Sequence, residues 1–155
     1  LKNYKNSMQI YMEITDFIVR LLVATAAGGA VGLERQWNNK TAGLRTNTLV
    51  AIGACIYVLI NVFLTEKGAD PTRIIAQIVT GVGFLGAGVI LHDHGSVHGL
   101  TTAATIWCSA ALGSLAGLGY YRETAICTVL VLIVNIAFKK ADLWFDSEKK
   151  KNEGK

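Results

Sequence analysis

The chain alternates between long apolar stretches and short polar clusters, and five apolar stretches follow one another. Each stretch approaches the ~20 residues that an α-helix needs to cross the hydrocarbon core of a bilayer. The stretches cover residues 14–33, 48–64, 73–91, 100–118 and 121–138. The pattern therefore predicts an all-α integral membrane bundle of about five transmembrane helices, within a transmembrane domain over residues 1–138.

The composition favours membrane helices over a soluble bundle. Hydrophobic residues make up 52% of the 155 residues and charged residues only 17%, with a mean hydropathy of +0.40. A soluble domain carries roughly 25% charged residues. The alternative, a soluble helical bundle, would have too little polar surface to cover five such stretches. The bilayer is therefore the first partner that the sequence predicts.

The charges between the stretches predict an orientation. With five spans, the side that receives the loop after the first span and the tail at 139–155 holds nine Lys and Arg residues, and the other side holds five. Basic loops are usually cytoplasmic. We therefore expect the C-terminus in the cytoplasm and the N-terminus outside. The charged tail is expected to form an interfacial helix followed by disorder. Within the first span, Asp16 and Arg20 are four residues apart and are expected to pair on one helix face.

Small residues recur at four-residue spacing and predict close helix contacts. The first span carries Gly28 and Gly32, the fourth carries Thr101, Thr105, Ser109, Gly113 and Gly117, and the third ends in GVGFLGAG with Gly81, Gly83, Gly86 and Gly88. The simplest interpretation is packing within one subunit. A homodimer seam, or a bent helix that lines a cavity, is the alternative. A nucleotide site at GVGFLGAG is excluded because it would need a soluble βαβ unit.

Polar residues cluster at the ends of the spans and form the candidate functional site. They are Glu34, Arg35, Gln36, Lys40, Arg45 and Thr46 after the first span, Asp70, Arg73 and Gln77 at the third, and Thr101, Thr102, Thr105 and Trp107 in the fourth. The first two groups are expected on opposite faces of the membrane, and Asp70 is expected to cap the third helix or to pair with Arg73. A solvated loop that meets anionic lipid is the structural alternative for the first group. Polar groups at membrane depth often mark functional sites.

Other candidate chemistry is sparse. His92, Asp93, His94 and His98 are close enough in sequence to hold a transition metal, but a polar turn is the simpler interpretation and the metal stays unknown. The three cysteines lie in separate apolar stretches and fit apolar packing. We find no nucleophile–base pair and no cofactor motif, so we expect neither an enzyme nor a cofactor. The pI near 9.0 fits basic membrane loops, and no nucleic-acid partner is expected.

Four segments resemble the signature of the MgtC/SapB family. They are GLERQ (32–36), KTAGLRT (40–46), DPTRIIAQIVTGVGFLGAGVIL (70–91) and GLTTAATIW (99–107). The resemblance covers roughly residues 14–137. It implies a bacterial inner-membrane protein linked to growth in low magnesium and to survival in host macrophages, with its important residues at the candidate positions named above.

The resemblance also implies a function class. Members interact with the F-type ATP synthase, and an older proposal made them magnesium transporters. MgtC-type members carry a cytoplasmic domain after the last span, whereas this sequence has only the tail there, so it resembles a short SapB-like member or one from which that domain was removed. The leading hypothesis is a regulatory or binding protein that contacts a membrane partner or a second copy of itself. The alternatives are a transporter or channel for magnesium or another solute, whose path is lined by Glu34, Arg45 and Arg73, and a sensor.

Overall fold

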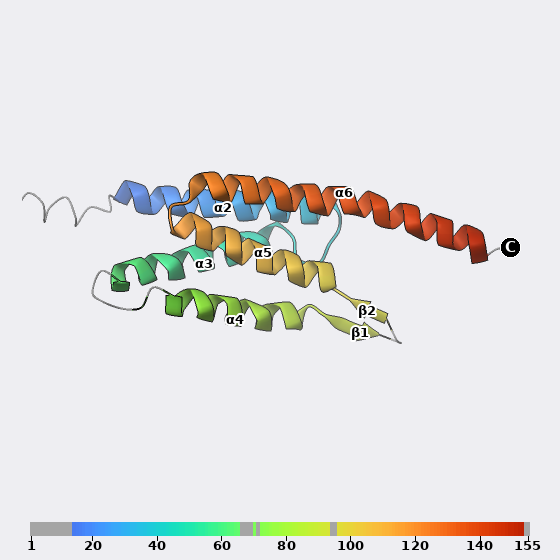
Figure 1. Ribbon diagram of the computed structural model, residues 1–155, viewed down its shortest axis with the longest axis horizontal. Coiled ribbons are helices and arrows are strands. Elements are labelled where there is room, and N and C mark those ends of the chain that lie inside the picture. The colour runs from blue at the N-terminus through green and yellow to red at the C-terminus, as the bar shows by residue number, and fades with distance from the viewer. Residues whose placement is uncertain (1–13, 66–69, 71, 94–95, 154–155) are drawn as a thin grey trace, which may run out of the picture.

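A bundle of helices with one small hairpin makes up the described chain (Figure 1). The computed structural model describes residues 14–65, 70, 72–93 and 96–153. The elements are α2 (Ile14–Trp37), α3 (Leu44–Thr65), α4 (Thr72–Gly88), β1 (Leu91–Asp93), β2 (Ser96–His98), α5 (Leu100–Gly117) and α6 (Tyr121–Glu153). Successive helices run in opposite directions along the long axis (Figure 1). The predicted all-α bundle is confirmed.

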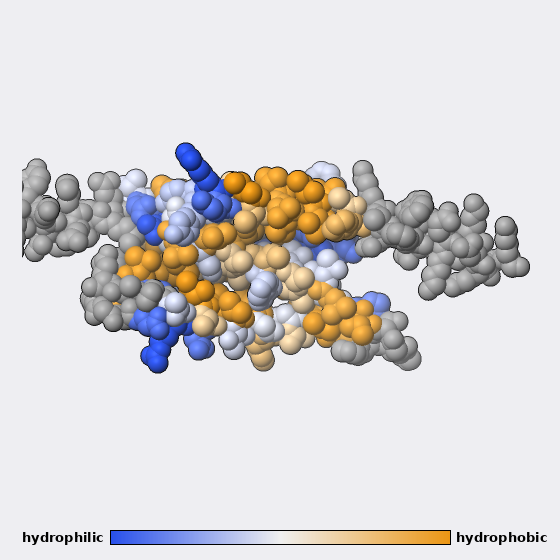
Figure 2. All heavy atoms as spheres, viewed as in Figure 1, coloured by the Kyte–Doolittle hydropathy of each residue, from blue (hydrophilic) through white to orange (hydrophobic). Residues whose placement is uncertain are grey.

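Four of the described helices are long and apolar enough to cross a membrane: Ile14–Trp37, Leu44–Val62, Leu100–Gly117 and Tyr121–Phe138. The predicted span at 73–91 is too long, because α4 has 17 residues and the chain enters the hairpin at Leu91. At 1.5 Å per residue α4 is ~25 Å long, slightly less than the ~30 Å hydrocarbon core. Hydrophobic residues cover the middle of α6 on the outside of the bundle, and hydrophilic residues gather where α4 and α6 begin (Figure 2).

The helix α2 continues past the predicted end at residue 33. Its end is a Schellman motif, in which Asn39 takes a positive φ of 52°, its N–H donates to the carbonyl of Gln36, and Lys40 N–H donates to that of Arg35. Asparagine tolerates this left-handed conformation better than most residues. Glu34, Arg35 and Gln36 therefore lie on the last helical turn and not in a loop.

The helix α3 begins at Leu44, four residues before the predicted start, so Arg45 and Thr46 lie in its first turn. The connection between α2 and α3 is correspondingly short. Gln36 closes it, because its side-chain oxygen accepts a hydrogen bond of 3.3 Å from the Leu44 N–H.

An antiparallel hairpin replaces the predicted polar turn between α4 and α5. Leu91 pairs with His98, and Asp93 pairs with Ser96. The side chains of His92, Asp93 and His94 lie outside the described residues, so the metal hypothesis is not tested there. The hairpin brings the end of α4 back to the start of α5.

The helix α6 is continuous from Tyr121 to Glu153, with 33 residues. Its apolar part, Tyr121–Phe138, coincides with the predicted span at 121–138, and the charged tail continues the same helix as far as Glu153. The sequence from 121 to 153 contains no proline or glycine, so nothing in it interrupts the helical hydrogen bonds. The helix is ~50 Å long, and Figure 1 shows its last part extending past the rest of the bundle.

Glycine brings α2, α3 and α5 into direct backbone contact at the centre of the bundle. A Cβ atom added at Gly113 would overlap the carbonyl group of Ala51, and one at Gly28 would lie 2.7 Å from the Asn47 carbonyl oxygen. Gly32 and Gly117 face α3 in the same way. This face of α5 is thus filled by α3 of the same chain, and the alternative of a homodimer seam along Gly113 and Gly117 is wrong.

The glycines of α4 behave differently. Gly86 faces the Ala103 side chain of α5, 3.6 Å from an added Cβ, but Gly81, Gly83 and Gly88 have nothing within 4 Å. The predicted packing of these three glycines within the chain is therefore wrong. The helix α4 lies at the edge of the bundle (Figure 1) and turns part of its small-residue surface outward.

Candidate functional site

A buried arginine links the last turn of α2 to the first turn of α5. Arg35 is only 3% exposed, and its Nη2 donates a 2.7 Å hydrogen bond to the Thr102 hydroxyl, which is also buried. The Nε–H of Arg35 is buried and has no hydrogen-bond partner. Burying a charged group with an unused donor is costly unless something satisfies it. Arg35 and Thr48, whose hydroxyl also lacks a partner, are the two described residues with a buried side-chain polar atom left unpaired.

Glu34, next to Arg35 in sequence, turns toward α6. One carboxylate oxygen accepts a hydrogen bond from the Asn38 amide, and the other accepts one of 3.1 Å from the amide of Asn135 on α6. No ion pair joins Glu34 to Arg35 among the described residues, where Asp16–Arg20 is the recorded pair. The two signature charges thus serve different interfaces of α2.

A second polar network, centred on Asn47, lies within the bundle. The Asn47 amide donates to the carbonyls of Ala42 (2.8 Å) and Gly43 (3.0 Å), and its oxygen accepts a 2.8 Å hydrogen bond from the Ser109 hydroxyl. Asn47 and Ser109 are both fully buried. Our candidate set omitted both residues. An amide at the edge of an apolar stretch was the available signal, because such groups are costly in lipid unless paired.

The predicted Asp16–Arg20 pair is confirmed at the opposite end of the bundle. Arg20 binds the Asp16 carboxylate at 2.8 Å and donates through Nη1 to the Gly117 carbonyl at 2.6 Å. Tyr121, at the start of α6, donates its hydroxyl to Asp16 at 2.8 Å. These contacts join α2, the end of α5 and the start of α6.

The start of α4 carries Asp70, which acts as a cap. Its carboxylate accepts hydrogen bonds from the Thr72 N–H (2.9 Å) and the Thr72 hydroxyl (2.8 Å). These bonds, the backbone one first, hold the pKa of Asp70 below its usual value, and Arg73 contributes a smaller charge effect. Of the two alternatives for Asp70, capping is the one that the geometry supports. The start of α4 and the end of α2, which carries Arg35, lie at opposite ends of the bundle (Figure 1).

The remaining candidate residues are dispersed. Thr105 is buried and donates to the Thr101 carbonyl of its own helix at 2.7 Å. Trp107 is 52% exposed on the outer side of α5, and Arg45 and Thr46 are also exposed. The structure therefore brings together only part of the predicted set.

A polar pocket gathers Arg35, Lys40, Thr101 and Thr102. It has a volume of about 410 Å³ and lies between the end of α2, the hairpin and the start of α5. The other lining residues are Asn39, Thr41, His98 and Gly99, and the apolar residues Val89, Leu91, Val97 and Leu100. Asp70, Arg73 and Gln77 are not part of it.

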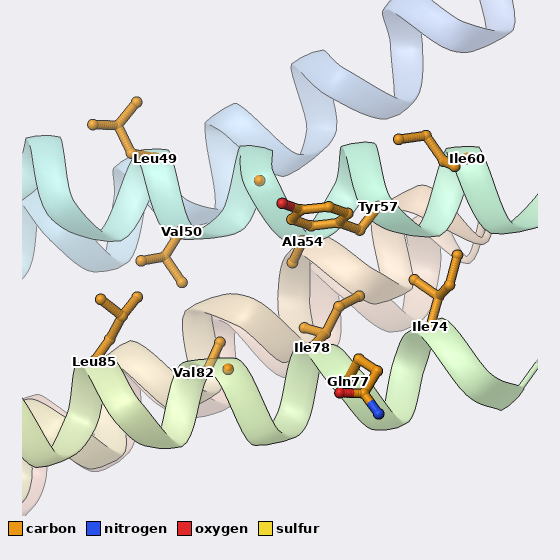
Figure 3. A pocket seen from close by; sticks show the side chains of 12 residues that line it. Leu49, Val50, Ala54, Tyr57, Ile60, Ile74, Gln77, Ile78, Val82 and Leu85 are labelled. Carbon is orange, nitrogen blue, oxygen red and sulfur yellow. The ribbon is translucent and has the colours of Figure 1, made fainter.

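An apolar groove runs between α3 and α4, with a volume of about 780 Å³. Val50, Ala54 and Tyr57 of α3 face Ile78 and Val82 of α4 across it (Figure 3). Gly53 and Gly81 line it and have no other atom within 4 Å of where a Cβ would stand. Gln77 is a polar residue in this lining.

These features define a helical membrane protein with a buried polar centre at one end and an open apolar groove on its flank. Residues 21–143 match the MgtC family, and the chain belongs to that family. The resemblance of the four sequence segments is thereby confirmed.

Relatives of known name agree with this assignment. The chain is 46% identical to protein MgtC of Salmonella typhimurium over 134 residues, which is 86% of this chain and 57% of that protein. It is 52% identical to protein MgtC of Brucella abortus over 108 residues, 70% of this chain and 45% of the relative. An uncharacterised protein of Synechocystis is 52% identical over 128 residues, 83% of this chain and 54% of the relative. The chain thus spans about half the length of the curated relatives it matches. No solved structure gives a significant match.

Proposed function

We propose that this chain is a regulatory or binding protein of the bacterial plasma membrane, which acts through helix contacts with another membrane protein. By family resemblance its role is linked to magnesium homeostasis, and the F-type ATP synthase is a candidate partner. The observation that carries the proposal is the apolar groove between α3 and α4. The groove leaves small-residue helix surface uncovered on the flank of the bundle.

The small residues in the groove favour a helix as the occupant. Inside lipid, helices gain little from hydrophobic burial, so close contact between backbones supplies much of the association energy. Gly28, Gly32, Gly113 and Gly117 are already used in contacts within the chain, whereas Gly53 and Gly81 are not. A partner helix against these two glycines would make the same kind of contact.

Transport by this chain is the alternative, and the interior of the bundle supports it less well. A path for an ion needs polar groups with free hydrogen-bonding capacity along its length. Asn47 and Ser109 bind each other, Gly113 is in contact with the backbone of α3, and Glu34 is bonded to Asn38 and Asn135. Their hydrogen bonds and backbone contacts are already made within the chain.

The test uses two glycines on the same helix. Leucine at Gly81 fills the groove, whereas leucine at the matched control Gly83 points into open surroundings outside it. A photo-crosslinking residue in place of Tyr57, which is 58% exposed and lines the groove, should capture a partner helix in native membranes. We expect Gly81→Leu to lower the yield of the crosslinked adduct at least ~10-fold and to abolish function in low-magnesium growth. Gly83→Leu should keep both the adduct and the function.

An adduct that survives Gly81→Leu would contradict the proposed use of the groove. The second arm measures magnesium entry into liposomes that contain the purified chain. We expect no flux above empty liposomes. Flux that disappears with Arg73→Ala or Glu34→Gln would overturn the regulatory proposal in favour of a transporter. An adduct between two copies of the chain would identify self-association as the contact.

A further inference from the structure

The polar pocket at the end of α2 has the donor set of an anion site. Arg35 lines it, is 3% exposed and has a buried Nε–H without a partner. Lys40 and His98 also line it, and its described lining contains no carboxylate. Glu34, adjacent to Arg35, is bonded to Asn38 and to Asn135 of α6.

The start of α5 adds a second, independent source of positive potential. Gly99 is the N-cap and makes no side-chain cap hydrogen bond, and the first helical bond runs from the Ala103 N–H to the Gly99 carbonyl at 2.8 Å. The N–H groups of the residues between them begin an 18-residue helix and have no partner within it. Gly99, Thr101 and Thr102 line the pocket, so the positive end of the helix dipole borders the same space as Arg35.

The backbone at Gly99 lies in close contact with the chain just after α4. Its φ is 89°, a conformation that L side chains rarely adopt, and an added Cβ would overlap the Val89 carbonyl oxygen. With glycine there, the chain just after α4, at Val89, can pack directly against the start of α5. The pocket walls are thus set by backbone as well as by side chains.

We propose that this pocket binds a phosphate-type anion, which accepts hydrogen bonds from the Arg35 guanidinium and from the first turn of α5 while Lys40 supplies charge. Donors that converge from two helices and a loop suit a tetrahedral anion, because its oxygens point in several directions. The volume of about 410 Å³ holds such a group. The phosphate comes either from a lipid headgroup or from a small soluble ligand, and the chemistry of recognition is shared. This proposal goes beyond the partner contact in the α3–α4 groove and does not depend on it.

The experiment measures binding to the purified chain in nanodiscs. Native mass spectrometry follows retention of phosphatidylglycerol against phosphatidylcholine, and ³¹P NMR titration follows inorganic phosphate. Lys40→Gln removes a pocket charge, and the matched control Arg45→Gln removes an exposed charge nearby that does not line the pocket. Arg35→Lys keeps the charge but removes the Nε–H.

We expect Arg35→Lys to weaken anion binding ~10-fold or more and Lys40→Gln to weaken it several-fold, while Arg45→Gln changes it less than twofold. Retention of phosphatidylglycerol alone assigns the site to a headgroup, and saturable inorganic phosphate binding assigns it to a soluble anion. Equal losses in Lys40→Gln and Arg45→Gln would mean a diffuse surface charge effect and would overturn the site. So would unchanged binding in a folded Arg35→Lys variant, with folding checked by its thermal transition.

Discussion

Each polar side chain inside this bundle needs a hydrogen-bond partner within the protein, because lipid offers none. Asn47 meets this need with three bonds, two to carbonyls at the start of α3 and one from Ser109 of α5. Arg35 meets it only in part, through Thr102. Asn47 therefore stabilises the fold, whereas Arg35 still has a hydrogen-bond donor that a ligand can use.

The Asn47–Ser109 contact is expected to be a stability determinant. Ser109→Ala should lower the free energy of unfolding by about 0.6 kcal/mol, typical of interhelical hydrogen bonds in membrane proteins. Asn47→Ala should cost about 1–3 kcal/mol, because it removes the only recorded partner of a buried hydroxyl as well as two bonds to carbonyls. Unfolding in mixed micelles measures both. The double variant should cost no more than Asn47→Ala alone, and fully additive losses would contradict the direct bond.

Local spacing predicted some residue contacts and missed others for a physical reason. Asp16 and Arg20 are four apart, so helix geometry alone places them together. Arg35 and Thr102 are 67 residues apart and meet because α2 and α5 cross. That contact follows from helix packing, which local spacing does not contain. The importance of Glu34 and Arg35 came from the family resemblance, whereas their separate directions came from the fold.

At the scale of elements, the helix ends decide which residues can form a site. The Schellman motif at Asn39 extends α2 far enough to carry Arg35 to the start of α5. A second one ends α5, where Gly119 has a φ of 82° and Tyr120 N–H donates to the Leu115 carbonyl. Hydropathy misplaced the end of α2, because apolar content fades at residue 33 before the helical hydrogen bonds do. Its predicted end for the fourth span, residue 118, lies one residue past the last residue of α5.

The cap at Asp70 predicts a pH-dependent start of α4. Because the folded pKa of Asp70 lies below the unfolded value of 3.8, the stabilisation by its carboxylate is fully present above pH 3.8 and is lost as the pH falls through the folded pKa. Asp70→Ala should raise hydrogen exchange at the Thr72 amide at neutral pH, since the cap hydrogen bond to that N–H is gone.

The matched control for this cap is Asp70→Asn, which can still accept the Thr72 hydrogen bonds but does not titrate. It should keep near-normal protection, with no pH dependence from this site. Equal fraying in the alanine and asparagine variants would show that charge, and not capping, holds the start of α4.

At the scale of the whole molecule, the alternating helix directions place the polar pocket, the hairpin and the end of α6 on one side of the bundle (Figure 1). The distribution of basic residues predicts that this side is cytoplasmic. The architecture itself was predictable, because apolar periods of ~20 residues permit few alternatives in lipid. The two pockets could not be predicted from the sequence, because they depend on the distance between α4 and α3 and on the position of the hairpin next to α5.

The predicted orientation can be measured by cysteine labelling. In a background without Cys55, Cys108 and Cys127, Arg122→Cys at the start of α6 should react with an impermeant maleimide in intact cells. Arg45→Cys at the other end should react only after the membrane is permeabilised. Both positions are exposed, so a difference in labelling would reflect the side of the membrane and not the burial of the side chain. The reverse pattern would invert the orientation, and place the polar pocket outside the cell.

The two carboxylates of α2 are both held by α6, and this has a consequence for biosynthesis. Tyr121 reaches Asp16 and Asn135 reaches Glu34 across 105 and 101 positions of the chain. While the ribosome makes the intervening helices, α2 stands in the translocon or the lipid without these partners. The last helix to emerge, α6, is therefore the one that completes the hydrogen bonds of the first, α2. A nascent chain that stops before Tyr121 leaves Asp16 with Arg20 alone and Glu34 with Asn38 alone, and this incomplete pairing is a feature that membrane quality control can recognise.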